Sequence, residues 1–483
     1  MRGKPLIDRN QERQASKATL GTDRVLESST LFVTTLTSFI GPFMISSVNV
    51  ALPAIQAEFS ANAVQLSWLA TAYLLATAIL LVPAGKVADI YGRKKIFVSG
   101  LALYTVASGL AALAKTVAWL IVMRVLQGAG AAMFVTTGMA ILTSVFPPHK
   151  RGRAIGIYVA AVYIGLSVGP FVGGLLTRYC HWRSIFVLVF LLGILAVLLT
   201  VRFLKGEWAD AREETFDLTG ALLYGTAIFV LVYGATCIPD YMAVYLILTG
   251  IVGLVAFVLH EKRTRYPVFE VTLFQTNRTF AFSSLAALIN YSATFAITFL
   301  LSLYLQFLKG LAPQTTGAVL MAQPLVMALL SPLAGRLSDR VEPRVLASSG
   351  MLVTALGLFN FARVQIETPV ATIIGTLVLV GFGFALFSSP NMSAIMGAVH
   401  KKYYGIASGA VATMRLLGQM FSMATATVVL TIFIGNEPIQ PSNYPEFLGS
   451  VKSAFVIFAV LCVTGVYFSF ARGQLRGEGT KGG

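Results

Sequence analysis

The stretch "GKVADIYGRKK" (residues 85–95) returns in weakened form 250 residues later, as "GRLSDRVEPR" (335–344). Both read Gly-x-x-x-Asp followed by basic residues, and both directly follow a long apolar run. A second pair, "AIGIYVAAVYIG" (154–165) and "ASGAVATMRLLG" (407–418), is separated by 253 residues. Two pairs at nearly the same separation indicate that the chain contains two related halves.

The composition places the chain in a lipid bilayer. Of its 483 residues, 56% are hydrophobic and 12% are charged, and the mean hydropathy is +0.78. A soluble globular protein carries about twice this charged fraction. Residues 1–29 are polar and basic without an apolar core, so we expect no cleavable signal peptide. The three cysteines and four histidines are scattered, and we therefore expect no disulfide framework, metal site or cofactor.

A membrane-spanning helix needs roughly 20 apolar residues. On this basis the sequence predicts fourteen spans of helical period and length. They cover residues 30–53, 66–86, 96–114, 118–141, 153–177, 184–203, 218–237, 242–260, 279–307, 314–334, 345–362, 370–396, 404–434 and 452–471.

The repeats divide these spans into two groups. They align span 2 with span 10 and span 5 with span 13, so the simplest arrangement is six spans, two inserted spans and six more. Repeated six-span halves are typical of secondary transporters. The predicted fold is an all-α polytopic membrane protein. Its segments are a basic tail (1–29), a six-helix bundle (30–203), two inserted helices with flanking loops (204–278), a second six-helix bundle (279–471) and a tail (472–483).

The positive charges predict the orientation. One set of loops together with both termini holds 28 of the 36 Lys and Arg residues, and the opposite loops hold six. Lys and Arg concentrate in cytoplasmic loops. We therefore expect a multi-pass protein of the cell membrane with both termini in the cytoplasm. Because the net charge of +16 comes largely from these loops, we expect no nucleic-acid partner.

Four motifs resemble those of the major facilitator superfamily, within its fourteen-span drug:proton antiporter branch. They are "GKVADIYGRKK" (85–95), "RVLQGAGAA" (124–132), "GLSVGPFVGG" (165–174) and "VNVALP" (48–53). The resemblance covers about residues 30–470. It implies a major facilitator fold and a non-enzymatic role, the export of small amphipathic molecules or drugs by alternating access, with protons as a second partner. Import or uniport of a neutral or anionic metabolite is the alternative, and we expect a monomer.

The resemblance implies that the loop of residues 85–95 is a gate latch, which holds the cytoplasmic side closed in one state. Its residues are Gly85, Asp89, Gly92, Arg93 and Lys94, with Asp339 as the counterpart in the second half. Asp89 lies among basic residues, from which it can accept charge-assisted hydrogen bonds. A plain positively charged loop would explain the basic residues but not the two glycines and the acid at this spacing.

The glycines of span 5 lie four residues apart. Gly165, Gly169 and Gly173, with Gly174 beside them, form a smooth helix face against which another helix can pack closely. Pro170 removes one backbone hydrogen bond and favours a kink. Two interpretations remain open: a static packing groove, or a pivot between the two halves, as the resemblance implies.

The resemblance also implies that spans 1, 4, 9 and 12 line a central cavity. Polar residues gather on these spans and in span 13. The candidates for substrate binding or coupling are Ser46, Ser47, Asn49, Arg124, Gln127, Asn290, Tyr291, Gln306, Ser389, Asn391 and Arg415. An ionisable residue inside a membrane indicates a functional site. The alternatives are a hydroxyl bonded to its own helix backbone and, for Arg124, a side chain that reaches the membrane surface.

None of the 20 acidic residues lies deep in a predicted span. The resemblance implies an acid in span 1, five residues before Asn49, where this chain has Met44. Proton coupling normally needs a group that titrates inside the membrane. It would therefore depend here on Asp89, Asp217 or Glu261 at the cytoplasmic rim, or be absent. Arginines without a deep acid favour a neutral, amphipathic or anionic substrate over a bare cation.

Overall fold

The computed structural model describes residues 9–209, 211–238, 241–269, 271–338, 340–399, 404–435 and 437–473. These residues are helical apart from short connections, and no strand occurs among them. In chain order the elements are α1 (Arg9–Phe59), α2 (Ala63–Tyr91), α3 (Arg93–Ala112), α4 (Val117–Val145), α5 (Pro148–Tyr179), α6 (Arg183–Phe203), α7 (Leu218–Thr236), α8 (Tyr241–Glu261), α9 (Thr272–Thr276), α10 (Arg278–Thr294), α11 (Ile297–Leu303), the π-helical turn η1 (Tyr304–Leu308), α12 (Pro313–Leu320), α13 (Ala322–Ser338), α14 (Pro343–Phe361), α15 (Val370–Gly397), α16 (Tyr404–Ile434), the 3₁₀ turn η3 (Pro441–Asn443) and α17 (Tyr444–Ala471).

The prediction of fourteen membrane-spanning helices is confirmed. Within the described residues, fourteen helical segments are long and apolar enough to cross a bilayer. The ninth joins α10, α11 and η1, and the tenth joins α12 and α13. The first span covers Leu26–Phe59, but its helix begins at Arg9, so the segment predicted as a polar tail is helical from that residue onward.

Polar residues between the apolar runs set the helix starts. Asn62 and Gln65 form a capping box at the start of α2: the Asn62 side chain accepts from the Gln65 backbone N–H (2.7 Å), and the Gln65 side chain accepts from that of Asn62 (3.0 Å). The Thr116 hydroxyl accepts from the Trp119 N–H at the start of α4 (3.2 Å). Such caps satisfy backbone donors that have no partner within the helix.

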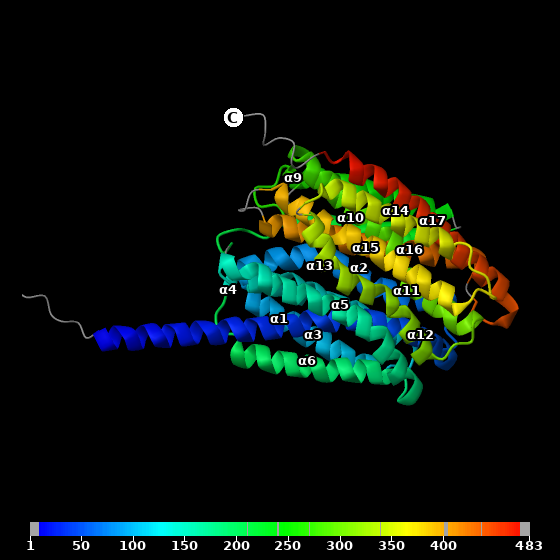
Figure 1. Cartoon of the computed structure of the whole chain (residues 1–483), viewed down its shortest axis with the longest axis horizontal. Coiled ribbons are helices and arrows are strands. Elements are labelled where there is room, and N and C mark those ends of the chain that lie inside the picture. Colours follow the sequence, from blue (N-terminus) through cyan, green and yellow to red (C-terminus); the bar gives the residue numbers. More distant parts are fainter. Residues whose placement is uncertain are drawn as a thin grey trace, which may run out of the picture.

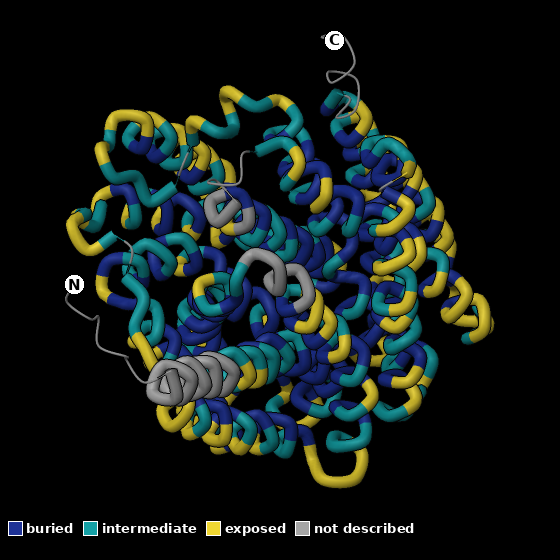
Figure 2. Tube along the Cα trace, turned by 60° about the vertical axis from the view of Figure 1, so that its left-hand side comes forward, coloured by how far each residue is buried: buried dark blue, intermediate teal, exposed yellow. Residues whose placement is uncertain are grey.

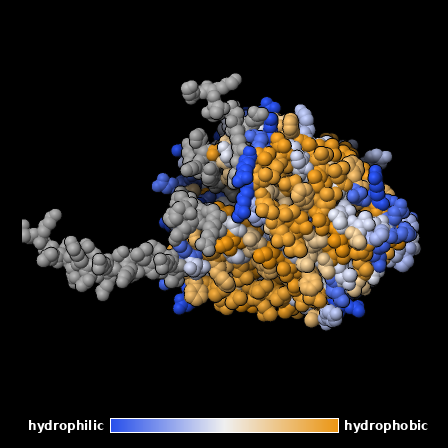
Figure 3. All heavy atoms as spheres, in the orientation of Figure 1, coloured by the Kyte–Doolittle hydropathy of each residue, from blue (hydrophilic) through white to orange (hydrophobic). Residues whose placement is uncertain are grey.

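The helices run side by side, and the beginning of α1 and the end of α17 point to the same end of the bundle (left in Figure 1), called the terminal end here. The opposite end is called the distal end. The middle of the molecule presents a hydrophobic face, while hydrophilic residues gather towards the two ends (Figure 3). Buried residues fill the interior (Figure 2). An apolar belt around helices whose backbone groups are internally bonded is the arrangement a bilayer requires.

Two helix groups and an inserted pair make up the bundle. Helices α1–α6 form one half and α10–α17 the other, and α7 and α8 pack against each other as a separate pair, called the insert. In the insert, α7 contacts both α2 of the first half and α16 of the second. The Tyr224 hydroxyl donates to the Ala78 carbonyl oxygen of α2 (3.0 Å). The outer helix α8 faces away from the bundle with large apolar residues such as Tyr245 and Val252.

Helix α5 connects the halves because it has two smooth faces. One packs against α1, the most extensive helix pairing in the molecule. A side chain at Gly173 would place its Cβ 2.7 Å from the Ser47 Cα. On the other face, a Cβ at Gly174 would lie 2.8 Å from the Gln314 Cα of α12, which belongs to the second half. The glycine motif thus serves both packing within one half and contact between the halves.

Replacing Gly173 by Leu is expected to destabilise the bundle, because the side chain would push α5 away from α1. Overpacking of this kind typically costs about 1–3 kcal/mol. The measurement is thermal unfolding of the purified protein in detergent. Gly156→Leu in the same helix is the matched control, since no neighbouring atom of the described residues lies within 4 Å of the position that a Cβ would take there. Equal loss of thermal stability in both variants would contradict the close α1–α5 contact.

Candidate functional site

The two serines of "FMISSVNVALP" (43–53) bond to helix backbones, Ser46 within α1 and Ser47 across to α5. The Ser46 hydroxyl donates to the Pro42 carbonyl oxygen (2.9 Å), and the Ser47 hydroxyl donates to that of Gly169 in α5 (2.8 Å). Met44, at the position where the resemblance implies an acid, is fully buried within the hydrophobic core. This stretch therefore contributes packing contacts to the α1–α5 interface.

Asn49 and Gln306 mark the contact between the halves towards the distal end. The backbone oxygen of Asn49 accepts from the Ser302 hydroxyl (2.6 Å), and the backbone oxygen of Val50 accepts from the Gln306 side-chain amide (2.9 Å). A further bond joins the Gln56 side chain to the Ile439 carbonyl oxygen (2.7 Å). These bonds join α1 to α11, η1 and the segment before α17, so the halves meet closely at this end.

Arg124 and Gln127 lie inside the first half. The Arg124 side chain, 1% exposed, donates to the Leu69 carbonyl oxygen (2.9 Å) and to the Gln127 side-chain oxygen (2.9 Å). Gln127 in turn donates to the Ser108 hydroxyl (2.8 Å), and the Tyr73 ring lies 4.4 Å from the guanidinium carbon. This network ties α4 to α2 and α3. It directs both predicted residues towards the bundle interior in this conformation.

Asn391 has a comparable place inside the second half. Its side-chain oxygen accepts from Arg472 (2.7 Å), and its side-chain nitrogen donates to the Ser283 carbonyl oxygen (3.1 Å). Arg472, 1% exposed, also donates to the Pro343 carbonyl oxygen (3.0 Å). Burial lowers the pKa of Arg472 to about 10, which leaves it charged at neutral pH. The sequence assigned Arg472 to a tail, because it directly follows the last apolar run.

Two other predicted residues also pack within the second half. Asn290 of α10 is completely buried, and its side-chain oxygen and nitrogen have no hydrogen-bond partner among the described residues. Ser389 of α15 lies against α13, where its hydroxyl would be 2.8 Å from a Cβ at Gly335. The prediction that these side chains line a cavity stays a prediction, since the bundle interior surrounds them here.

Tyr291 and Arg415 meet in the middle of the molecule with residues of the first half. The Tyr163 hydroxyl of α5 lies 3.3 Å from the Ser388 hydroxyl of α15, and Tyr291 lies within electrostatic range of Tyr163 and Arg415. Tyr158 of α5 is also within electrostatic range of Arg415. These five residues, Tyr158, Tyr163, Tyr291, Ser388 and Arg415, are called the central cluster. They come from α5, α10, α15 and α16, and thus from both halves.

The central cluster combines one positive charge with aromatic rings and hydroxyl groups. Tyr163, Tyr291, Ser388 and Arg415 are each partly exposed although they lie within membrane-spanning helices. Within the described residues, no ion pair involves Arg415. A guanidinium without a carboxylate partner can bind an acceptor oxygen or an anionic group, and tyrosine rings can pack against a planar molecule.

Sequence reasoning pointed to Tyr291 and Arg415 as candidates and to Ser388 as a polar residue of span 12, and it missed Tyr158 and Tyr163. A signal for the tyrosines was present in the second repeat, "AIGIYVAAVYIG". The offset of 253 residues aligns Arg415 with position 162, directly before Tyr163. If the halves are related by symmetry, equivalent positions face the same centre. The repeat could therefore have placed α5 tyrosines opposite Arg415.

The predicted latch residues lie together at the terminal end. Asp89 accepts from the Arg93 Nε (2.7 Å), and Arg93 also donates to the Ser144 hydroxyl of α4 (2.8 Å). A Cβ at Gly85 would lie 3.1 Å from the Thr136 hydroxyl, so Gly85 permits close packing of α2 on α4. Asp339 lies outside the described residues.

The linker between α6 and α7 (residues 204–217) covers this loop, a contact that the sequence did not reveal. The Glu207 carboxylate accepts from the Lys94 backbone N–H at the start of α3 (2.8 Å), and the Trp208 carbonyl oxygen accepts from that of Arg93 (2.8 Å). Lys86 pairs with Glu214 of the linker. Gly92, at φ +120°, leaves room for the Glu207 carboxylate, which would lie 2.6 Å from a Cβ there.

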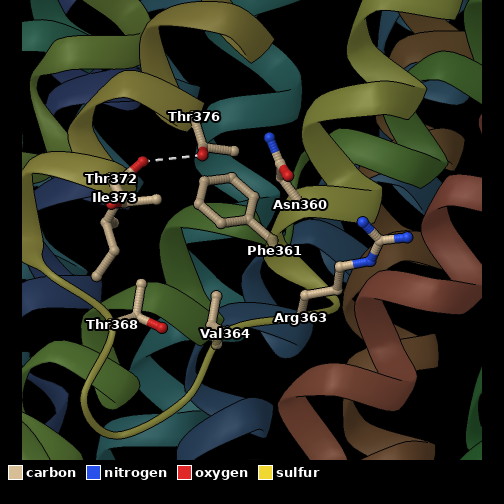
Figure 4. Close-up of a pocket in the computed structure, with 8 residues that line it drawn as sticks. All are labelled: Asn360, Phe361, Arg363, Val364, Thr368, Thr372, Ile373 and Thr376. Atoms are coloured by element: carbon tan, nitrogen blue, oxygen red, sulfur yellow. Dashed lines mark hydrogen bonds between the residues drawn. The ribbon is translucent and has the colours of Figure 1, made fainter.

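A small pocket lies apart from these residues. It has a volume of about 160 Å³ and lies between α14 and α15 towards the distal end, lined by residues such as Phe361, Arg363 and Thr376 (Figure 4). The Thr376 hydroxyl in its wall donates to the carbonyl oxygen of Thr372 (2.9 Å). The predicted site residues that the structure describes do not line this pocket.

Comparison with known proteins identifies the family. The family model described as Major Facilitator Superfamily matches residues 34–423 and residues 283–480. The chain is 32% identical over 422 residues to the riboflavin transporter RibZ of Clostridioides difficile (strain 630), covering 86% of this chain and 90% of that protein. It is 32% identical over 416 residues to the multidrug resistance protein Stp of Mycobacterium tuberculosis (strain CDC 1551 / Oshkosh), covering 84% and 77%. A third relative is the tetracenomycin C resistance and export protein of Streptomyces glaucescens, 28% identical over 404 residues, with 83% and 74% covered.

Solved structures agree on the fold. A bacterial homologue of the human lysosomal transporter Spinster superposes with a TM-score of 0.68 at 17% identity, covering 92% of this chain and 97% of that chain. At this identity the likeness concerns the fold alone. The matches by sequence extend across both halves, and the relatives are transporters rather than enzymes. The chain therefore belongs to the Major Facilitator Superfamily and is a multi-pass membrane transporter.

Proposed function

We propose that the chain exports small amphipathic molecules, neutral or anionic, from the cytoplasm by alternating access. The observation that carries this proposal is the central cluster, in which residues of both halves surround an arginine that has no acidic partner within the described part of the chain. The terminal end, with its excess of Lys and Arg, faces the cytoplasm of a cell membrane. In this conformation the distal end is the closed one, and the transporter works as a monomer.

Electrostatics supports the proposed preference for neutral or anionic substrates over cations. A unit charge about 6 Å from the Arg415 guanidinium interacts with it by about 3 kcal/mol at an effective dielectric constant of ~20. That energy corresponds to a factor of about 100 in affinity. A bare cation bound beside Arg415 is disfavoured by this amount, because no carboxylate in the cluster offsets the repulsion, whereas an anionic group gains a similar amount.

The relatives support export and also keep import as a second candidate. The Streptomyces relative is by its name an export protein, and Stp is a multidrug resistance protein. RibZ, at the same identity as Stp, is a riboflavin transporter. A neutral planar molecule of the riboflavin type fits the tyrosines of the central cluster, so uptake of such a compound is the alternative function.

Transport by the purified protein in liposomes tests the proposal. The panel contains ethidium as a cation, riboflavin as a neutral molecule and fluorescein as an anion, each measured with and without an imposed pH gradient. We expect riboflavin or fluorescein to move faster than in empty liposomes, with ethidium the poorest substrate. Movement of ethidium driven by the proton gradient, unchanged in Asp89→Asn, would contradict the proposed substrate class and the role of the cytoplasmic latch.

Removing the charge of Arg415 is expected to change this selectivity. In Arg415→Gln, the ratio of fluorescein to ethidium transport falls by up to about 10,000-fold, because the anion loses a factor of about 100 and the cation gains a similar factor. Arg415→Lys keeps most of the ratio. Arg363→Gln at the distal end removes the same charge far from the cluster and serves as the matched control. An unchanged ratio in Arg415→Gln would exclude this residue from substrate recognition.

The linker contacts support a gating role for the loop of residues 85–95. Glu207 and Glu214 hold this loop against the first half, and they occupy two of its donors, the Lys94 backbone N–H and the Lys86 side chain. For the terminal end to close, the loop would have to approach the second half instead. We expect the linker to favour the state in which the terminal end is open.

The Gly92→Ala variant tests this linkage. At φ +120° an alanine is strained by about 1–3 kcal/mol, and its methyl group would displace the Glu207 carboxylate from the start of α3. We expect a lower thermal unfolding temperature together with a changed transport rate. Gly310→Ala is the control, since it also has a positive φ (+63°) but no described neighbour within 4 Å of the added methyl group. Equal effects on transport would argue against a gate at Gly92.

A further inference from the structure

Two carboxyl groups meet at the terminal end of the insert. Asp217 directly precedes α7, and Glu261 is the last residue of α8. A Cβ at Gly220, one turn into α7, would contact both the Asp217 Oδ2 and the Glu261 Oε1. The two oxygens therefore converge over the same point of the α7 backbone. Asp217 and Glu261 are called the insert carboxyl pair.

Glu261 is buried and only half satisfied. The residue is 3% exposed, and its Oε2 accepts from the Phe269 backbone N–H (3.0 Å). Its Oε1, the oxygen that faces Asp217, has no hydrogen-bond partner in the described part of the chain. A buried polar atom without a partner is costly, and such groups call for a specific explanation. A proton on this oxygen, or on the one opposite, would supply the missing hydrogen bond.

The hydrogen-bond partners of Asp217 come from the start of α7 and from the end of α8. Its Oδ1 accepts from the Gly220 backbone N–H (2.9 Å), and the His260 Nε2 lies 3.1 Å from Oδ1 and 3.0 Å from Oδ2. The Asp217 side chain is 10% exposed. These contacts lie on Oδ1 and Oδ2 of Asp217 itself and leave the Glu261 Oε1 without a partner in the described part of the chain. The remaining negative charge, on Glu261, then faces another carboxylate rather than a cation.

Among the residues that the structure describes, no Lys, Arg or His forms an ion pair with Glu261. Lys86 of α2 pairs with Glu214 instead. Its ammonium group also lies over the ring of Tyr266, which follows Glu261 by five residues (5.9 Å to the ring centroid). The titratable groups next to Glu261 are Asp217, which meets it over Gly220, and His260, its neighbour in the chain. Among the described residues, no three His, Cys, Asp or Glu side chains are arranged to hold a metal ion. A proton is the smallest cation that fits between two facing carboxyl oxygens.

We propose that the insert carboxyl pair is a proton-binding site, at which Glu261 and Asp217 share one proton. Two carboxylates that face each other at close range do not both ionise readily. Loss of the proton leaves two like charges against the α7 backbone and pushes the ends of α7 and α8 apart. Because α7 contacts α2 of one half and α16 of the other, this movement reaches the joint between the halves. Its use in transport rests on the proposed function, whereas proton binding itself does not.

Infrared difference spectroscopy of the purified full-length protein tests the site without any substrate. In a titration from mildly acidic to mildly alkaline pH, we expect the carbonyl stretch of a protonated carboxylic acid to disappear. Glu261→Gln is expected to remove this band. Glu58→Gln is the matched control: Glu58 at the distal end accepts from the Trp182 indole (2.6 Å) and from Arg183 (2.7 Å). It is expected to leave the band intact.

Two further variants keep the test decisive if Glu261→Gln does not fold. Asp217→Asn removes the opposing negative charge, so the band should titrate at lower pH than in the unmodified protein. His260→Ala removes the donor that supports Asp217, so the titration should move to higher pH. A missing band in the unmodified protein, or an unchanged band in the folded Glu261→Gln variant, would overturn the proposal.

A transport measurement distinguishes proton binding by the insert carboxyl pair from the use of that proton in transport. In liposomes, Glu261→Gln should still let riboflavin equilibrate but should lose its accumulation driven by a pH gradient. If the infrared result holds and no panel compound is transported, the proton site stands and the proposed function fails. If riboflavin is accumulated normally by Glu261→Gln, the site plays no part in coupling.

Discussion

Helices in a bilayer associate without a hydrophobic effect between them. In this protein the close approach of α5 to both α1 and α12 supplies the attraction. Van der Waals contact then depends on small residues that bring the backbones together. Gly173 presses against α1 and Gly174 against α12, so adjacent residues connect one helix to both halves. The α5 side chains Tyr158 and Tyr163 reach the middle of the molecule only because the backbone of α5 is held at this distance.

The absence of water inside the bilayer also determines how the charged side chains are bound. Arg124 and Arg472 are completely buried, and carbonyl oxygens and amides of neighbouring helices bind them. Both residues stabilise one half internally. Arg415 differs because no described carboxylate pairs with it and it lies within electrostatic range of tyrosines from both halves. Two of these three arginines thus fasten helices, and the third is the one that we propose as a substrate contact.

The fold was predictable from the sequence, whereas the site was predictable only in part. Length and hydropathy determine where a helix crosses the bilayer, so the fourteen spans follow from the chain alone. The division into two related halves stays a prediction from the repeats. The direction of a side chain around its helix does not follow from hydropathy in a helix that is apolar on all sides. Arg124 and Arg415 therefore looked equivalent in sequence. Glu207 was overlooked as a functional contact because its partner lies in a segment distant in the chain. Glu261 was named as a candidate for proton coupling, but the sequence did not reveal that its carboxyl group meets that of Asp217 over Gly220.

The inserted pair of helices also has a mechanical consequence. The Tyr224 bond to α2 and the Lys86–Glu214 pair fasten the insert to the first half. Although α7 also contacts α16 of the second half, its hydrogen bond goes to α2, so we expect the insert to follow α1–α6 when the halves rock against each other. The covalent tether between the moving bodies is then the segment of residues 262–277, whose extended reach of about 50 Å exceeds any displacement expected in a bilayer-sized protein. Shortening that segment would restrict the amplitude of the rocking motion while leaving each bundle intact.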